Sequence, residues 1–153
     1  MAPAPAPHDP LTVFLLAALV PLRRRLAELL QDEGMKIVGE SSSASDAARS
    51  IPVLGPRVAV LDLTVPDGNG IALCREVRRT SPGTRCVILA SFFDHRAYGA
   101  AMEAGASAFV LRQIRNHGLP DAVRRAACTE PSVRVSSGPG CVPGRSAGPA
   151  GPR

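Results

Sequence analysis

The chain has 153 residues, 45% of them hydrophobic, which is enough for one domain of ordinary size with a buried core. Its formal net charge of +5 is modest, and its 18 basic and 13 acidic residues are interspersed. This pattern is typical of a solvated surface, so we expect no direct contact with nucleic acid. Four cysteines lie far apart without a Cys-x-x-Cys pair, which supports neither a zinc site nor a thiol-redox motif.

Proline and glycine divide the chain into three segments. Residues 1–10 contain four prolines, and residues 129–153 contain five prolines and five glycines. Segments of this composition bury too little apolar surface to offset the entropy of an ordered chain. We therefore expect disorder in residues 1–10 and 129–153, and one folded domain across residues 11–128.

The apolar run at residues 11–22 is the strongest candidate for a membrane or targeting segment. A helix needs about 20 apolar residues to span a bilayer, and this run is shorter. No basic residue precedes it, although a secretory signal would have one. We therefore expect a cytoplasmic protein with no membrane segment.

Five strand–helix pairs follow one another along the central segment. Apolar runs indicate strands at Thr12–Leu16, Met35–Gly39, Val58–Leu61, Cys86–Ala90 and Ala108–Leu111. Apolar residues at helical spacing indicate helices around residues 22–30, 47–48, 71–77, 97–104 and 119–127. Proline opens the first helix, a serine cluster caps the second, and Gly105 ends the fourth. This alternation predicts an α/β fold with an open, parallel five-stranded sheet covered by helices on both faces.

In a sheet of this kind the functional crevice lies beyond the carboxyl ends of the strands. The strand Val58–Leu61 leads directly into Asp62, which places one carboxylate there. The other strand ends supply Ala17, Ala18, Ala90, Ser91 and Arg112. Residues 17–21, after the first strand, contain no glycine, so this loop cannot wrap a phosphate as nucleotide-binding fingerprints do. Nucleotide enzymes of this architecture are thereby disfavoured.

The segment Val60–Gly70, which reads VLDLTVPDGNG, closely resembles receiver domains of response regulators of the NarL/LuxR type, particularly the actinobacterial dormancy-survival regulators. The resemblance continues through Ile71–Arg75, Arg85–Leu89 and Ala104–Leu111, so it covers essentially all of residues 11–128. It implies a CheY-like receiver domain with the flavodoxin-like, doubly wound (βα)5 fold, which serves two-component signal transduction and is not an enzyme. In this family a histidine kinase transfers a phosphoryl group to the aspartate at the position of Asp62.

Four of the five site positions depart from the family pattern. The two acidic residues that help to hold Mg²⁺ in the family are replaced by Ala17 and Ala18. The hydroxyl residue that ends the fourth strand is replaced by Ala90, and the lysine that ends the fifth strand is replaced by Arg112. Phe109 occupies the aromatic switch position, where the family uses tyrosine or phenylalanine.

The missing acidic pair predicts weak or absent Mg²⁺ binding. A carboxylate at about 4 Å attracts a divalent cation by several kcal/mol at an effective dielectric constant of about 20, so two lost carboxylates lower the affinity by orders of magnitude. We therefore expect no metal or cofactor in the degenerate pocket around Asp62, which comprises Ala17, Ala18, Thr64, Ala90, Ser91 and Arg112. Arg112 is expected to pair directly with Asp62, because a guanidinium is cationic and reaches as far as the lysine it replaces. Ser91 is a candidate substitute for the lost hydroxyl group.

These departures favour a pseudo-receiver, which acts by protein contact without Mg²⁺-dependent phosphorylation. The expected partners are a histidine kinase or a full-length response regulator, in a homodimer or heterodimer at the face of the fourth helix, fifth strand and fifth helix. One alternative is a single-domain response regulator phosphorylated on Asp62 by a histidine kinase, and another is a decayed or truncated DNA-binding regulator. Such regulators normally continue into a helix-turn-helix domain, which we do not expect in residues 129–153 because they show no helical periodicity.

Overall fold

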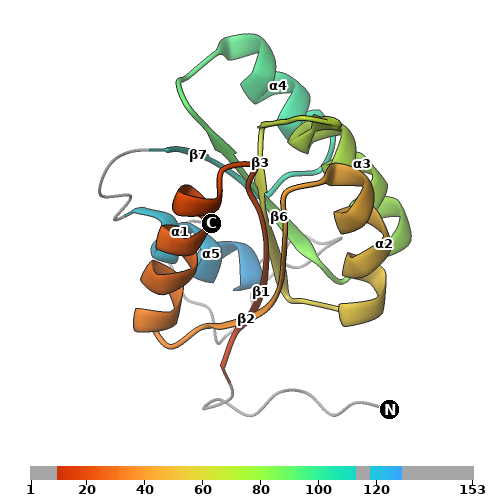
Figure 1. Cartoon of the computed structure of the whole chain (residues 1–153). Coiled ribbons are helices and arrows are strands. Elements are labelled where there is room, and N and C mark those ends of the chain that lie inside the picture. Colours follow the sequence, from red (N-terminus) through yellow and green to blue (C-terminus); the bar gives the residue numbers. More distant parts are fainter. Residues whose placement is uncertain (1–9, 113–117, 129–153) are drawn as a thin grey trace, which may run out of the picture.

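The computed structural model describes residues 10–112 and 118–128 (Figure 1). Within this part, five parallel strands form one sheet in the order β2-β1-β3-β6-β7. These strands are β1 (Thr12–Leu16), β2 (Lys36–Ser41), β3 (Val58–Asp62), β6 (Arg85–Ala90) and β7 (Ala108–Leu111). The helices are α1 (Val20–Asp32), α2 (Ala44–Leu54), α3 (Gly70–Thr80), α4 (His95–Glu103) and α5 (Gly118–Cys128). The expectations for residues 1–9 and 129–153 concern parts of the chain outside the described residues.

Helices cover both faces of the sheet, and the side chains of β1 alternate between the two layers. Val13 and Leu15 pack in a buried cluster with α1 and α5, whereas Phe14 and Leu16 pack in a second cluster with α2, α3 and α4 (Figure 1). Every residue of β3 and β6 is buried, as expected for central strands with helices on both sides. The predicted flavodoxin-like, doubly wound parallel sheet is therefore confirmed.

Short-range side-chain contacts set the ends of the helices. Ser43 caps α2 by accepting a hydrogen bond from the backbone N–H of Asp46 at 3.1 Å, which confirms the expected serine cap. Asn69 caps α3 in the same manner, and Asp94 caps α4. Gly105 follows α4 with a φ of 99°, a left-handed conformation that glycine adopts without steric penalty. None of the helices in the described ranges is both long enough and apolar enough to cross a bilayer.

The connection from β3 to α3 contains more structure than the expected turn. Thr64–Val65 (β4) and Gly68–Asn69 (β5) form a small antiparallel hairpin. Asp67 at its tip accepts hydrogen bonds from the Ser43 hydroxyl group at 2.8 Å and from two backbone N–H groups in the first turn of α2, at 2.8 and 3.1 Å. These three bonds lower the pKa of the Asp67 carboxyl group, and they attach the hairpin to α2.

Gly70 begins α3 directly against the end of β3. A Cβ atom at this position would lie 2.5 Å from the backbone oxygen of Asp62, which is closer than real Cβ contacts. Only glycine therefore allows this approach between α3 and the strand end that carries Asp62.

Candidate functional site

Asp62 ends β3 at the carboxyl edge of the sheet, as expected from the sequence. Its residue surface is 4% exposed, because β1 and β6 flank β3 and align Leu16 with Leu61 and Leu89 with Asp62. One carboxylate oxygen accepts a hydrogen bond from the backbone N–H of Thr64 at 3.4 Å. A nearly buried carboxylate therefore lies at the strand ends, where ligands bind in open α/β sheets.

Arg112, the residue after β7, reaches across the strand ends to Asp62. Its Nη1 donates a hydrogen bond to Asp62 Oδ2 at 3.3 Å, and its Nη2 donates to Ser91 Oγ at 2.6 Å. The side chain of Arg112 is 27% exposed and that of Asp62 is 5% exposed, so the ion pair is partly buried. The structure thus contains the expected ion pair, and it places Ser91 on the guanidinium of Arg112.

Burial and charge act in opposite directions on Asp62. Desolvation by burial raises the pKa of its carboxyl group, and this is the largest effect. The nearby guanidinium of Arg112 lowers the pKa, as do hydrogen bonds from the backbone of Thr64, Ala18 and Leu63. The pKa remains above its ordinary value, so the ion pair compensates only part of the cost of burying the charge.

Alanine occupies the positions beside Asp62 that were predicted from the sequence. Ala17 and Ala90 are fully buried, and Ala18 is partly buried. The carbonyl oxygen of Ala17 accepts a hydrogen bond from Arg23 Nη1 at 2.9 Å, while Arg23 Nε contacts Glu40 Oε1 at 3.2 Å. Within residues 10–112 and 118–128, no group of three or more His, Cys, Asp or Glu side chains is arranged to hold a metal ion.

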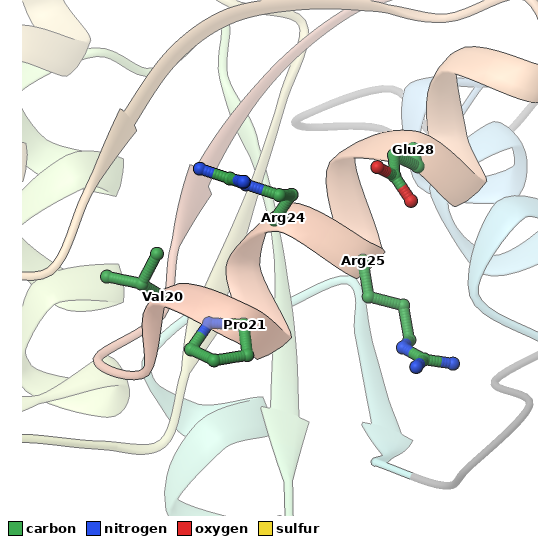
Figure 2. Close-up of a pocket in the computed structure, with 5 residues that line it drawn as sticks. All are labelled: Val20, Pro21, Arg24, Arg25 and Glu28. Carbon is green, nitrogen blue, oxygen red and sulfur yellow. The ribbon is translucent and has the colours of Figure 1, made fainter.

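Arg23 is a neighbour of this pocket that was not predicted from the sequence. Arg23 begins a run of three arginines, and only the rotation of α1 distinguishes it from Arg24 and Arg25. Its side chain is 18% exposed and folds back towards β1. Arg24 and Arg25 instead line a surface hollow along α1 with Val20, Pro21 and Glu28 (Figure 2). That hollow contains no residue of the Asp62 pocket.

Phe109 lies on β7 and is partly buried beside other aromatic rings. Its ring centroid is 5.6 Å from that of Tyr98 on α4 and 6.0 Å from that of Phe93, in edge-to-face arrangements. Ala90, at the end of β6, carries only a methyl group and therefore offers no hydroxyl group for a hydrogen bond. Phe109 also packs against the buried cluster that contains Phe14 and Leu16.

The family model for the response regulator receiver domain matches residues 20–124 of this chain. The chain belongs to the response-regulator receiver family. Receivers are signalling modules and not enzymes, which agrees with the fold and with the position of Asp62. The two-component assignment expected from the sequence is thus confirmed at the level of the family.

A curated relative supports this assignment, and two solved structures share the fold. The chain is 42% identical over 113 residues to the DNA-binding transcriptional activator DevR/DosR of Mycobacterium tuberculosis. The aligned residues cover 73% of this chain and 52% of that protein. A LuxR-family response regulator of Aurantimonas has a TM-score of 0.72 at 26% identity, with 76% of this chain and 84% of that chain covered. The receiver domain of a response regulator named NarL, from M. tuberculosis, has a TM-score of 0.73 at 22% identity, with 78% and 97% covered. The chain spans about half the length of the curated response regulators that it matches first.

Proposed function

We propose that this receiver is a pseudo-receiver, which signals in the cytoplasm by protein contact without Mg²⁺-dependent phosphorylation. The observation that carries the proposal is the direct ion pair between Arg112 and Asp62, at 3.3 Å. In the phosphorylated members of the family, a metal ion and a lysine share the charge of this aspartate. Among the residues that the structure describes, Arg112 is the counterion.

The residues around Asp62 do not fit a magnesium ion. Mg²⁺ requires an octahedral set of oxygen ligands, which proteins supply through carboxylates and water. Ala17 and Ala18 carry no side-chain oxygen, and the carbonyl oxygen of Ala17 already accepts a hydrogen bond from the cationic side chain of Arg23. A divalent cation beside Asp62 would also lie next to the guanidinium of Arg112 and would be repelled by it.

Phosphoryl transfer to Asp62 is disfavoured for the same reasons. The carboxylate of Asp62 must be accessible to attack, but the guanidinium of Arg112 already donates a hydrogen bond to one of its oxygens. Negative charge that develops on the phosphoryl oxygens needs cations and hydrogen-bond donors positioned to stabilise it. Ala90 has no donor to offer, and Ser91 already contacts Arg112.

Output is proposed to occur through the face formed by α4, β7 and α5, which we call the contact face. Its partner would be a histidine kinase or a full-length response regulator, or a second copy of the chain, without direct contact to DNA. Arg125 on α5 is exposed, whereas Asp62 is buried, so the two can be altered independently. The contact face therefore provides an output that does not require chemistry at Asp62.

Capture experiments test this division of roles. Tagged protein should retain a full-length regulator or histidine kinase from its own cells when Asp62 is replaced by alanine, and should lose that partner in the Arg125→Glu variant. The reverse pattern would refute the proposal and would favour a single-domain response regulator that acts through phosphorylated Asp62. Loss of the partner in both variants, with intact folding by circular dichroism, would also contradict independence from Asp62.

Restoring the metal ligands provides a second test. The double variant Ala17→Asp/Ala18→Asp should gain measurable Mg²⁺ binding by calorimetry, because two carboxylates then join Asp62. Wild-type protein should show none at millimolar Mg²⁺. Equal binding by both proteins would show that other groups hold the ion.

A further inference from the structure

Ser91 is the exposed member of a group of three side chains in which Arg112 lies between Ser91 and Asp62. Ser91 Oγ accepts a hydrogen bond from Arg112 Nη2 at 2.6 Å, whereas the bond from Arg112 Nη1 to Asp62 Oδ2 measures 3.3 Å. Ser91 begins the exposed connection between β6 and α4, residues 91–94, while Asp62 is buried. The guanidinium therefore joins a hydroxyl group at the surface to a carboxylate in the interior.

The backbone holds Ser91 and Arg112 beside each other. Leu111, the last residue of β7, pairs in register with Ala90, the last residue of β6. The N–H of Arg112 donates a hydrogen bond to the carbonyl oxygen of Ala90. Ser91 and Arg112 therefore follow two hydrogen-bonded strands at the same level of the sheet. A group attached to Ser91 Oγ would lie next to the guanidinium without any movement of the strands.

A phosphoryl group on Ser91 would compete with Asp62 for this guanidinium. Phosphoserine carries a charge of about −2 at neutral pH and three acceptor oxygens, and arginine binds phosphate through two parallel hydrogen bonds. Arg112 donates one hydrogen bond to the carboxylate of Asp62, which carries a single charge and is desolvated by burial. A phosphate on Ser91 would therefore draw Arg112 away from Asp62.

A kinase that acts on Ser91 does not need the metal site that this pocket lacks. In phosphorylation of Asp62 the receiver itself would have to hold Mg²⁺, but Ala17 and Ala18 supply no carboxylate. In phosphorylation of a serine, the protein kinase holds Mg²⁺ and provides the catalytic base. Residues 91–94 are exposed and belong to no helix or strand, so the hydroxyl group is accessible from outside. The losses around Asp62 therefore leave Ser91 available as a phosphoacceptor.

We propose that Ser91 is a phosphorylation site and that its phosphorylation breaks the ion pair between Arg112 and Asp62. A serine/threonine protein kinase transfers the γ-phosphoryl group of ATP. The bond between the γ-phosphorus and the bridging oxygen of ADP breaks, a bond from that phosphorus to Ser91 Oγ forms, and the hydroxyl proton passes to the catalytic base of the kinase. The inference rests on the proposed function, since it names a control of the pocket that takes the place of phosphorylation at Asp62.

The break in the ion pair occurs where two elements of the contact face meet. Arg112 directly follows β7, and Ser91 begins the connection to α4. Phe93 in that connection lies 6.0 Å, centroid to centroid, from the ring of Phe109 on β7. Movement of Arg112 towards a phosphate on Ser91 therefore takes place at the joint between β7 and α4.

Mass spectrometry of the full chain purified from its own cells tests whether the modification occurs. Part of the protein should carry an added mass of about 80 Da on the peptide that contains Ser91, and the Ser91→Ala variant should lack it. The label should survive hydroxylamine, which cleaves the acyl phosphate of an aspartate but not a phosphoserine ester. Absence of phosphate on Ser91 in both growing and resting cells would overturn the proposal. A hydroxylamine-sensitive label on Asp62 would instead contradict the proposed function, so the two failures are distinguishable.

A chain with phosphoserine installed by codon reassignment tests the effect on the pocket. The matched control is Ser42→phosphoserine, because Ser42 is exposed directly after β2 and its side chain has no hydrogen bond to any described residue. The carboxyl carbon signal of Asp62 reports its ionisation by NMR. At the midpoint pH of wild-type protein, the ratio of ionised to protonated Asp62 should fall at least ~10-fold in Ser91→phosphoserine, since the carboxylate loses its counterion, and should not change in the control.

Two results of this titration would overturn the proposal. An unchanged ratio in Ser91→phosphoserine would show that Arg112 stays on Asp62. The second result concerns Arg112→Gln, in which the counterion is already absent, so that adding phosphoserine at position 91 should have a much smaller effect on Asp62 than it has beside Arg112. An equal effect with and without Arg112 would show that the phosphate acts on Asp62 by repulsion and not by breaking the ion pair.

Discussion

Replacing the two members of the Asp62–Arg112 pair should have unequal effects on stability. In Asp62→Asn the buried negative charge disappears, and Arg112 keeps contact with water because its side chain is 27% exposed. In Arg112→Gln the carboxylate of Asp62 stays buried without its counterion. Because burial raises the pKa of Asp62 more than Arg112 lowers it, the carboxylate is the destabilising member of the pair.

The expected magnitudes follow from the exposure of each partner. Removing one member of a buried pair destabilises a protein by about 3–5 kcal/mol, and the partial exposure of Arg112 reduces the expected loss in Arg112→Gln to about 2–3 kcal/mol. Asp62→Asn should change the unfolding free energy by about 0–1 kcal/mol, towards greater stability. The double variant should lie near Asp62→Asn, because the uncompensated charge is then absent.

Urea unfolding of the four proteins at pH 7 measures this cycle. A loss of 2–3 kcal/mol also lowers the melting temperature by about 8–12 °C for a domain of this size. Because the pKa of Asp62 is raised in the folded protein, folding favours the protonated carboxyl group. The stability that this protonation contributes is fully present below the ordinary carboxyl pKa, and it is lost as the pH rises through the raised pKa of the folded protein. The defect of Arg112→Gln should therefore shrink as the solution is acidified. Equal and additive losses in the two single variants, independent of pH, would refute this reasoning.

Three further outcomes are expected, two from the segment that follows β3 and one from a control position in α4. Gly70→Ala should lose about 2–4 kcal/mol of stability by chemical denaturation, since its Cβ would lie 2.5 Å from the Asp62 backbone oxygen. Gly99 lies in α4, and no atom lies within 4 Å of the carbon that an alanine would add there, so Gly99→Ala should raise the free energy of unfolding by about 0.5–1 kcal/mol. A loss of stability as large as that of Gly70→Ala would argue against a local clash at Gly70. Above pH 5, Asp67→Asn should have a lower melting temperature than wild type, and the difference should disappear in acid. Three hydrogen bonds lower the pKa of Asp67, so the stability that they contribute is lost as the pH falls through that lowered pKa. A difference in melting temperature that stays constant at all pH values would contradict a charge-dependent contact.

The limits of a strand could be predicted where a run of apolar residues marks the whole strand. The predicted limits of β1 and β7 match the structure, because each is a run of apolar residues that favour strands, although β1 is an inner strand and β7 is a partly buried edge strand. β2 was expected at Met35–Gly39 but spans Lys36–Ser41, because its last residues, Glu40 and Ser41, are polar and give no apolar signal. The hairpin of β4 and β5 was missed because two-residue strands have no periodicity to detect.

The pocket was predictable at the level of strand ends but not of side-chain contacts. Parallel strands place Asp62 and Arg112 on one edge of the sheet, so their ion pair could be expected from the order of elements. The bond from Arg112 to Ser91 depends on rotamers, and the contact of Arg23 with Ala17 depends on the rotation of α1. Neither leaves a pattern in the sequence. The gathering of Phe93, Tyr98 and Phe109 from three segments likewise required the fold.

Intact mass measurement after incubation with acetyl phosphate and Mg²⁺ is the most direct test of a receiver closed to phosphorylation. Wild-type protein should show no added phosphoryl mass of about 80 Da, because Arg112 pairs with Asp62 and neither Ala17 nor Ala18 supplies a carboxylate for a metal ion. The variant Ala17→Asp/Ala18→Asp/Arg112→Lys, which restores the family's charged groups, should acquire a label that Asp62→Asn removes. Ready labelling of wild-type protein at Asp62 would contradict the pseudo-receiver and would establish the chain as a working phosphoacceptor.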